Sequence, residues 1–375
     1  MSRPTFLVLG GFRASDWEDI WQRGHEWTVA LMKVGNVIYL ERAAAGRGGW
    51  RRVASRVANV LRTNRVPAER HVTTPFPARP EFVSWLQLPS STQRGWRGNA
   101  RRALDAAEAR RRELGWAEFS LVQVGTASET WIELGSMVDA PVWFDSAERF
   151  LYSAAYADVD REMMKRQVVE SALVTTDTEL TRSDWRGVRD DISVVPHGAK
   201  SWAAEPDWSC SRVAPYYVGS LHPALDTDFL SEVARLSGKN VVMVGDYPAD
   251  TAGAGLEFAG WVAGGDIPRR LSDATAGLVP YQGGEWRQGV YPSKVYDYFL
   301  AGAPAISTRL PALDGLEWAW QVDTAEEADE ALRRAEALTD DHRRAIRAFA
   351  LANTWDERFA RVSALLADAG VRVDG

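Results

Sequence analysis

The stretch 289-GVYPSKVYDYFLAGAPAIST-308 predicts a turn, a short helix and a buried strand in succession. Lys294 and Asp297 are three residues apart, about one helical turn. The Ala-Gly-Ala-Pro turn that follows ends the helix before a short apolar run. A helix leading directly into an apolar strand is typical of a parallel α/β sheet. The pair has two interpretations: an exposed ion pair on a helix surface, or a nucleotide clamp at a helix start.

The same alternation extends in both directions from this stretch. Helices near 226–237, 266–273 and 293–301 separate the predicted strands of the second half, which are 214–221, 240–246, 256–262, 276–281, 303–308 and a short one at 318–323. In the first half the predicted strands are 5–10, 34–41, 119–125, 140–145 and 192–198. Strands alternating with helices indicate doubly wound α/β domains.

The chain has 375 residues, more than one hydrophobic core usually holds, so two domains are expected. The segment 199–214 has no clear periodicity and is the best candidate linker. We therefore predict an N-terminal domain over 1–198, a C-terminal domain over 199–350 and a closing helix in 351–375 that packs back on the first domain.

Composition limits the possible partners and locations. The net charge of −7 provides no general reason to expect nucleic acid, although it does not exclude it as an acceptor. The single cysteine excludes an intramolecular disulfide framework. No apolar run reaches membrane-spanning length, so we expect a cytoplasmic protein. The arginine-rich segment 50–65 could contact an anionic membrane or an anionic acceptor, or be a solvated helix face.

Residues that follow the strands are the candidates for binding, because ligands of open α/β sheets bind at the carboxyl ends of strands. Gly219 and Ser220 could offer backbone amides to a phosphate, or simply form a turn. Lys294 could neutralise a pyrophosphate while Asp297 accepts hydrogen bonds from ribose hydroxyls. Trp261 follows a strand near the expected cleft, where a nucleobase docks, but is equally a candidate for the core.

Two Asp-x-Asp triplets, 158–160 and 226–228, raise the possibility of a metal site. Each opens a predicted helix, where acidic residues favour the helix dipole. We interpret both as helix caps and expect no metal.

Several of these motifs occur together in the order known from one enzyme family. VVPHGA (194–199), YYVGSL (216–221), LEFAGWV (256–262), GLVPY (277–281) and the opening stretch resemble the C-terminal half of GT-B glycosyltransferases. WEDIWQRGHEWTVALMKVGNVIYLE (17–41) and PVWFDSAERF (141–150) resemble the N-terminal half. The chain is most similar to glycosyltransferase family 4 and its teichuronic-acid and capsule-type relatives. This implies an α/β fold of two Rossmann-like domains facing a cleft, with a C-terminal helix crossing back.

The resemblance implies transfer of a hexosyl or pentosyl group from a UDP-, GDP- or dTDP-sugar to an acceptor hydroxyl, with retention and without metal. The residues expected on the donor side are Gly219, Ser220, His222, Trp261, Val262, Tyr291, Pro292, Ser293, Lys294 and Asp297. The family has two donor-side glutamates. The second corresponds to Asp297, whereas the first corresponds to Gly289, eight residues earlier, which departs from the family pattern.

On the N-terminal side, the resemblance implies an acceptor site at Gly10, Gly11, Asp16 and Glu148. The expected catalytic residues are Lys294, Asp297, Asp145 and His25. If the enzyme inverted configuration, a carboxylate base would be needed, and Asp16, Asp145 and Glu148 are the candidates. Each of these acids could instead be a cap or a turn residue, and a lone histidine is more often structural.

Two other functions remain open on the sequence. One is a degenerate GT-B protein that binds a nucleotide or a partner without transfer, which the Gly289 departure leaves open. The other is a GT-B-like sugar-nucleotide epimerase, although these enzymes use several histidines and the chain has five in all.

Overall fold

A computed structural model of the chain describes residues 3–10, 12, 14, 17, 21–41, 73–88, 90–147, 149–152, 158–220, 225–247, 254–371 and 373. Within these residues, no helix combines the length and apolar character needed to cross a membrane. The predictions for Gly11, Asp16, Glu148, His222 and the segment 50–65 lie outside the described residues.

The first of two sheets belongs to the N-terminal half of the chain. Its strands are all parallel, in the order β3-β2-β1-β4-β5-β6-β7. They are β1 (Thr5–Leu9), β2 (Asn36–Leu40), β3 (Glu81–Val83), β4 (Phe119–Val124), β5 (Val142–Asp145), β6 (Leu173–Thr176) and β7 (Ser193–Val194). The helices are α1 (Arg23–Val34), α3 (Gln93–Glu113), α4 (Glu129–Gly135), α5 (Asp158–Glu170) and α6 (Glu179–Asp184). The strand order reverses between β1 and β4, the position where doubly wound sheets bind ligands.

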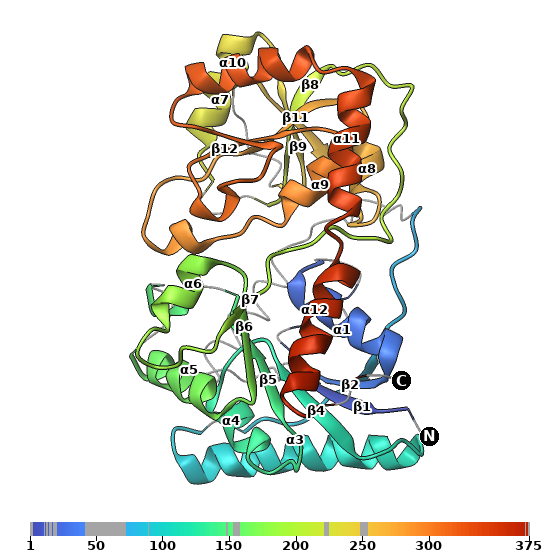
Figure 1. Ribbon diagram of the computed structural model, residues 1–375, viewed down its shortest axis with the longest axis vertical. Coiled ribbons are helices and arrows are strands. Elements are labelled where there is room, and N and C mark those ends of the chain that lie inside the picture. Colours follow the sequence, from blue (N-terminus) through green and yellow to red (C-terminus); the bar gives the residue numbers. More distant parts are fainter. Residues whose placement is uncertain are drawn as a thin grey trace.

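The second sheet is also parallel, in the order β10-β9-β8-β11-β12-β13. Its strands are β8 (Ala214–Val218), β9 (Val241–Val244), β10 (Leu256–Gly260), β11 (Ala274–Val279), β12 (Ala305–Thr308) and β13 (Ala319–Val322). The helices are α7 (Thr227–Ser237), α8 (Ile267–Arg270), α9 (Lys294–Leu300), α10 (Ala325–Glu336) and α11 (Asp340–Leu351). Figure 1 shows the two domains one above the other. The predicted pair of Rossmann-like α/β domains is confirmed.

The last helix, α12 (Trp355–Asp368), returns to the N-terminal domain (Figure 1). Its buried side chains join the core that contains Trp27 of α1, and the Trp27 and Trp355 rings meet edge to face at 4.9 Å. Just before α12 the chain lies beside Ala199, whose N–H donates to the carbonyl of Asn353 at 2.8 Å. Two segments, one before β8 and one before α12, therefore run side by side between the domains.

The short edge strand β3 was not predicted. The strand β3 is three residues long and pairs in parallel with β2 at the edge of the first sheet. It begins with Glu81, which forms an ion pair with Arg110 of α3. An edge strand this short, with a charged residue, shows neither an apolar run nor alternation, so no local pattern identifies it.

Candidate functional site

Lys294 and Gly219 meet at the carboxyl ends of the second sheet. The Lys294 ammonium lies 4.0 Å from the centre of the Tyr217 ring and 5.3 Å from that of Tyr281. It is so close to Gly219 that a Cβ added there would be 2.9 Å from Nζ. Burial alone would lower the pKa of Lys294, but interactions with Tyr281 and Tyr217 outweigh it, and the pKa is raised. The lysine is therefore a cation, and it forms no ion pair with any residue that the structure describes.

The backbone at Gly219 is held from two sides. Its N–H donates to the carbonyl of Val244 at 2.9 Å, and its carbonyl accepts from the Tyr247 hydroxyl at 2.5 Å. Its φ of +140° lies in a region that side chains disfavour, which explains the glycine. Because the Gly219 N–H already donates to the carbonyl of Val244, it does not provide the phosphate-binding donor that we expected. Gly219 instead leaves room for Lys294.

Helix α9 is short, and its first turn uses its own amides. Val295 N–H donates to the carbonyl of Pro292, and Tyr296 N–H to that of Ser293, each at 3.1 Å. The expected contribution of free N–H groups at this helix start is therefore reduced, and the Lys294 side chain is the main positive group here. Ser293 is exposed, whereas Pro292 is buried.

Asp297 lies on the buried side of α9 with 5% of its surface exposed. Its Oδ1 accepts from Lys200 Nζ at 2.5 Å. Burial raises the pKa of Asp297, and the neighbouring ammonium of Lys200 opposes that effect. The acid expected to pair with Lys294 therefore forms its salt bridge with Lys200, 97 residues away in the sequence.

Of the other predicted donor-side residues, Trp261 and Val262 follow β10 directly and are partly buried. Tyr291 is 7% exposed and stacks on His197, with ring centres 5.3 Å apart. Burial raises the pKa of Tyr291 and lowers that of His197. Both rings are therefore uncharged, and Tyr291 joins the segment before β8 to the segment before α9. This is a packing role rather than an open contact surface.

Gly289, at the position where the glycosyltransferases that the sequence resembles have a glutamate, lies against Arg149 from the N-terminal domain. The Arg149 guanidinium forms a buried bidentate pair with Asp184, at 2.7 and 2.6 Å, and donates to the carbonyl of Glu285 at 2.7 Å. The absence of a side chain at 289 therefore has a steric reason. An arginine from the other domain occupies the space that a glutamate would need.

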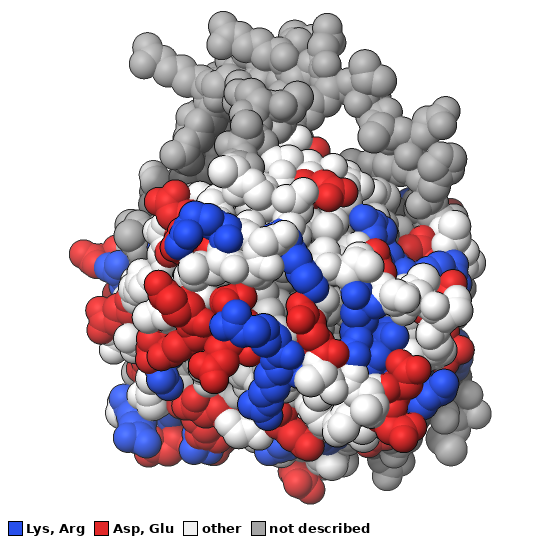
Figure 2. Space-filling view, turned by 90° about the horizontal axis from the view of Figure 1, so that it is seen from above, with Lys and Arg blue, Asp and Glu red and all other residues white. Residues whose placement is uncertain are grey.

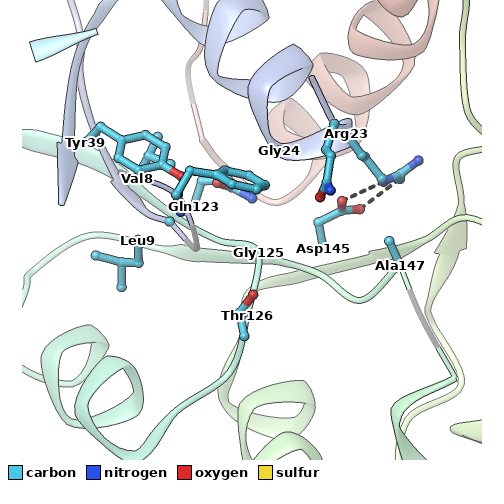
Figure 3. A pocket seen from close by; sticks show the side chains of 13 residues that line it. Val8, Leu9, Arg23, Gly24, Tyr39, Gln123, Gly125, Thr126, Asp145 and Ala147 are labelled. Atoms are coloured by element: carbon cyan, nitrogen blue, oxygen red, sulfur yellow. Dashed lines mark hydrogen bonds and ion pairs between the residues drawn. The ribbon is translucent and has the colours of Figure 1, made fainter. Parts of the chain in front are cut away.

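A pocket of about 170 Å³ opens at the carboxyl ends of β1, β4 and β5 (Figure 3). Gly10 lies in its wall, and the Tyr39 ring covers Gly10 so closely that a Cβ would clash with it. Gln123, also in the wall, is 2% exposed, and its Nε2 finds no hydrogen-bond acceptor among the described residues. The pocket thus combines an aromatic surface with an unused amide donor, which suits a hydroxyl-bearing ligand.

Asp145 also borders this pocket, but its carboxylate is saturated. Arg23 donates to both oxygens at 2.7 and 2.9 Å (Figure 3). Trp27 Nε1 and Thr175 Oγ1 each donate to the same carboxylate at 2.7 Å. The ion pair is 7% exposed on the arginine side and 4% on the aspartate side. A base must accept a proton from its substrate, so this environment argues against the catalytic role expected for Asp145 and indicates a structural one.

His25 is likewise enclosed. It is fully buried, its Nδ1 accepts from the Gln22 backbone N–H at 3.1 Å, and its ring packs against Phe12, Trp17 and Trp21. The structural alternative, a capping residue of α1, describes these contacts better than a catalytic role does.

The Asp-x-Asp triplets occupy helix starts. Asp226 caps α7 by accepting from Phe229 N–H at 2.9 Å, as predicted. Asp158 opens α5 and pairs with Arg161. No cluster of three or more potential metal ligands occurs within the described ranges.

Lys200 and Arg149 are residues of the site that were not predicted from the sequence. Their contacts join segments far apart in the sequence: Lys200 reaches Asp297 of α9, and Arg149 reaches the Glu285 carbonyl of the other domain. Arg149 lies within the quoted PVWFDSAERF motif, but nothing in that motif indicates this contact. Lys200 follows the quoted VVPHGA motif directly, and that position after a strand is the only local signal that could have identified it.

No protein-family model matches the chain. Over 113 residues it is 26% identical to TuaH of Bacillus subtilis, whose description names it a glycosyltransferase of teichuronic acid biosynthesis. This match covers 30% of the chain and spans only 23% of the length of TuaH.

The similarity to solved structures covers almost the whole chain. HepE of Anabaena in complex with UDP has a TM-score of 0.64 at 11% identity, over 98% of this chain and 100% of HepE. HepE with UDP-glucose has a TM-score of 0.62 at 11% identity, over 97% and 99%. A glycosyltransferase of Rickettsia africae has a TM-score of 0.63 at 10% identity, over 98% and 99%. Together with the two parallel sheets, these similarities show that the chain has the GT-B fold of glycosyltransferases.

Proposed function

We propose that the chain is a glycosyltransferase that moves a sugar from a uridine diphosphate sugar to an acceptor hydroxyl. The observation that carries this proposal is the Lys294 ammonium, held against Gly219 at the carboxyl end of β8 without a carboxylate partner among the described residues. A partly buried ammonium without a carboxylate partner is stabilised when it binds an anion. A diphosphate fits the position, with the ribose at Asp297 and the base beside Trp261 and Val262.

The choice of uridine follows from the HepE structures, which contain UDP and UDP-glucose. GDP- and dTDP-sugars are the competing donors, and competition for the UDP site distinguishes them.

The N-terminal pocket is the proposed acceptor site. Arg23 and Asp145 neutralise each other in its wall, so the pocket favours a group without net charge. The Gln123 Nε2 donor and the Tyr39 ring are suited to the hydroxyls and the apolar face of a sugar.

The proposed chemistry places the acceptor oxygen on the anomeric carbon while the bond from that carbon to the diphosphate breaks. The electron pair of this bond leaves with UDP, and Lys294 stabilises the negative charge that develops. The acceptor proton passes to the departing phosphate oxygen. Saturation of the Asp145 carboxylate supports retention, because attack on the same face as the leaving group needs no carboxylate base. In this proposal Lys294, rather than a metal ion, provides the positive charge.

Calorimetric titration with UDP tests the donor site. We expect Lys294→Met to weaken UDP binding on the order of tenfold, because a charge-assisted contact to phosphate is lost. Lys239→Met is the matched control, since Lys239 pairs with Glu336 on the surface of the same domain. Equal UDP affinity in the wild type and Lys294→Met would contradict the proposal.

Release of UDP from UDP-glucose in the presence of sugar acceptors then tests transfer, and NMR of the product anomer tests retention. The Gly289–Arg149 contact favours one second candidate, a GT-B protein that binds the nucleotide without transferring a sugar. Tight UDP binding with no turnover of any nucleotide sugar would support that candidate instead.

A further inference from the structure

Three charged side chains from separate segments meet between the domains, and the proposed function assigns a role to only one of them. They are Glu26 of α1, Lys200 in the segment between β7 and β8, and Asp297 of α9. Lys200 and Asp297 form a salt bridge of 2.5 Å, and their side chains are only 11% and 7% exposed. Removing both charges of a buried pair from water costs free energy. The presence of a lysine at this position therefore needs a specific explanation.

Glu26 approaches the same ammonium from the N-terminal domain. It is 4% exposed, and its Oε1 accepts from Trp21 Nε1 at 2.5 Å. Burial raises the pKa of Glu26 to about 7, while the charge of Lys200 opposes this rise and that of Asp297 adds to it. Glu26 is thus a neighbour of the salt bridge, whereas the short contact of Lys200 is with Asp297.

The Asp297 carboxylate is only half used. Oδ1 accepts from Lys200, and Oδ2 accepts no hydrogen bond from any residue that the structure describes. Lysine donates from a single point, unlike the two-pronged guanidinium of arginine, so it can bind one carboxylate oxygen and leave the other open.

We propose that Lys200 is a positioning residue for the nucleotide donor: it holds Asp297 through Oδ1, so that Oδ2 stays available to a ribose hydroxyl. This inference rests on the proposed function, because it assigns the ribose to Asp297. It adds a residue from the interdomain segment, outside the motifs of the donor-binding half, to the determinants of nucleotide selectivity.

The test compares nucleotides that differ only in the ribose. Titration with UDP, 2′-deoxy-UDP and 3′-deoxy-UDP yields a ribose selectivity ratio, and UDP against UMP yields a diphosphate ratio. In Lys200→Met we expect the ribose ratio to fall on the order of tenfold, because Asp297 loses the contact that orients it. The diphosphate ratio, which reports on Lys294, is expected to stay unchanged. A general loss of structure would weaken all four nucleotides alike.

Two further variants sharpen the result. Glu26→Gln removes the neighbouring carboxyl charge but leaves the salt bridge, so its ribose ratio is expected to match the wild type. Lys200→Arg keeps the charge, yet a guanidinium forks across both carboxylate oxygens and competes with the ribose for Oδ2. We therefore expect its ribose ratio to fall as well, and Lys200→Arg carries the test if Lys200→Met does not fold.

A wild-type ribose ratio in both Lys200 variants would overturn this inference while leaving the proposed function intact. A wild-type protein that binds no UDP would overturn the proposed function and this inference with it. Loss of the ribose ratio in Glu26→Gln to the same degree would also overturn it, because any disturbance of the cluster would then have the same effect.

Discussion

Arg149 of the N-terminal domain lies directly on Gly289 of the C-terminal domain: a Cβ built at Gly289 would be 2.2 Å from both Cγ and Cδ of Arg149. Real Cβ atoms do not approach other carbons so closely, so any side chain at 289 must push the arginine away. Arg149 cannot move freely, because Asp184 and the Glu285 carbonyl hold its guanidinium. The contact therefore ties the loop before α9 to the other domain.

This relationship predicts the effect of a single methyl group. Gly289→Ala should lower the free energy of unfolding by roughly 1–3 kcal/mol, the usual cost of overpacking, and Gly289→Glu by more. Urea denaturation measures the change. Gly283→Ala is the matched control, since Gly283 lies in the same loop, has ordinary φ and has open space around its Cβ position. Equal stability of the two alanine variants would show that Arg149 moves aside at little cost.

A second prediction concerns the space that Gly219 leaves for Lys294. In Gly219→Ala the new Cβ would be 2.9 Å from Lys294 Nζ, so the ammonium must shift. We expect UDP binding to weaken about tenfold, as for loss of a charge-assisted contact. Gly315→Ala is the control, because it also has positive φ but no atom within 4 Å of the added carbon. If both variants bind UDP like the wild type, Lys294 does not depend on this space.

The pKa of Glu26 predicts a pH dependence of stability. Its folded pKa of about 7 lies above the ordinary value of 4.5, so the folded state holds the proton more tightly. Protonated Glu26 contributes on the order of 3 kcal/mol to the free energy of unfolding. This contribution is fully present below about pH 4.5 and is lost as the pH rises through 7. Glu26→Gln removes this titration. The free energy of unfolding of Glu26→Gln should therefore rise relative to that of the wild type as the pH increases from 5 to 8.

Thermal or urea unfolding of both proteins across this range tests that prediction. The buried His197, whose pKa is lowered, acts in the opposite direction: its contribution is lost as the pH falls below the ordinary histidine value of 6.5. Because His197 is present in both proteins, it cancels in the comparison. Parallel stability profiles for wild type and Glu26→Gln would show that Glu26 is not the titrating group.

A fourth prediction separates a structural from a catalytic Asp145. Replacing it by asparagine leaves Arg23 as a buried charge without its partner, which should cost about 3–5 kcal/mol of stability. A general base could be removed without such a loss. Asp323→Asn is the matched control, since Asp323 forms the same bidentate contact with Arg309 on the exposed surface, and we expect a much smaller effect. Unchanged stability in Asp145→Asn, together with lost transfer, would restore the catalytic interpretation.

The described residues on the face at the end of the C-terminal domain form no large basic patch. Viewed from the end of the C-terminal domain, acidic and basic side chains are interspersed (Figure 2). That nucleic acid is not a general partner stays a prediction, as does membrane contact through 50–65.

How far the sequence predicted the site depends on the kind of contact. Gly219 and Lys294 were both expected on the donor side and lie together, because the carboxyl ends of parallel strands meet at one edge of a sheet. The partner of Asp297 was not predictable in the same way. Lys294 is its neighbour in sequence, but α9 turns the Lys294 ammonium toward Tyr217 while Asp297 faces Lys200.

The sequence by itself determined the two α/β domains, because apolar runs of strand length between amphipathic helices are local patterns that hold wherever the segments come to lie. Only the tertiary structure decided which charges are satisfied. Asp145 is saturated by Arg23, 122 residues away, and Arg149 fills the place beside Gly289 from 140 residues away. A buried charge takes the partner that lies within hydrogen-bond reach, and that distance exists only after both domains and the interdomain segments have packed together.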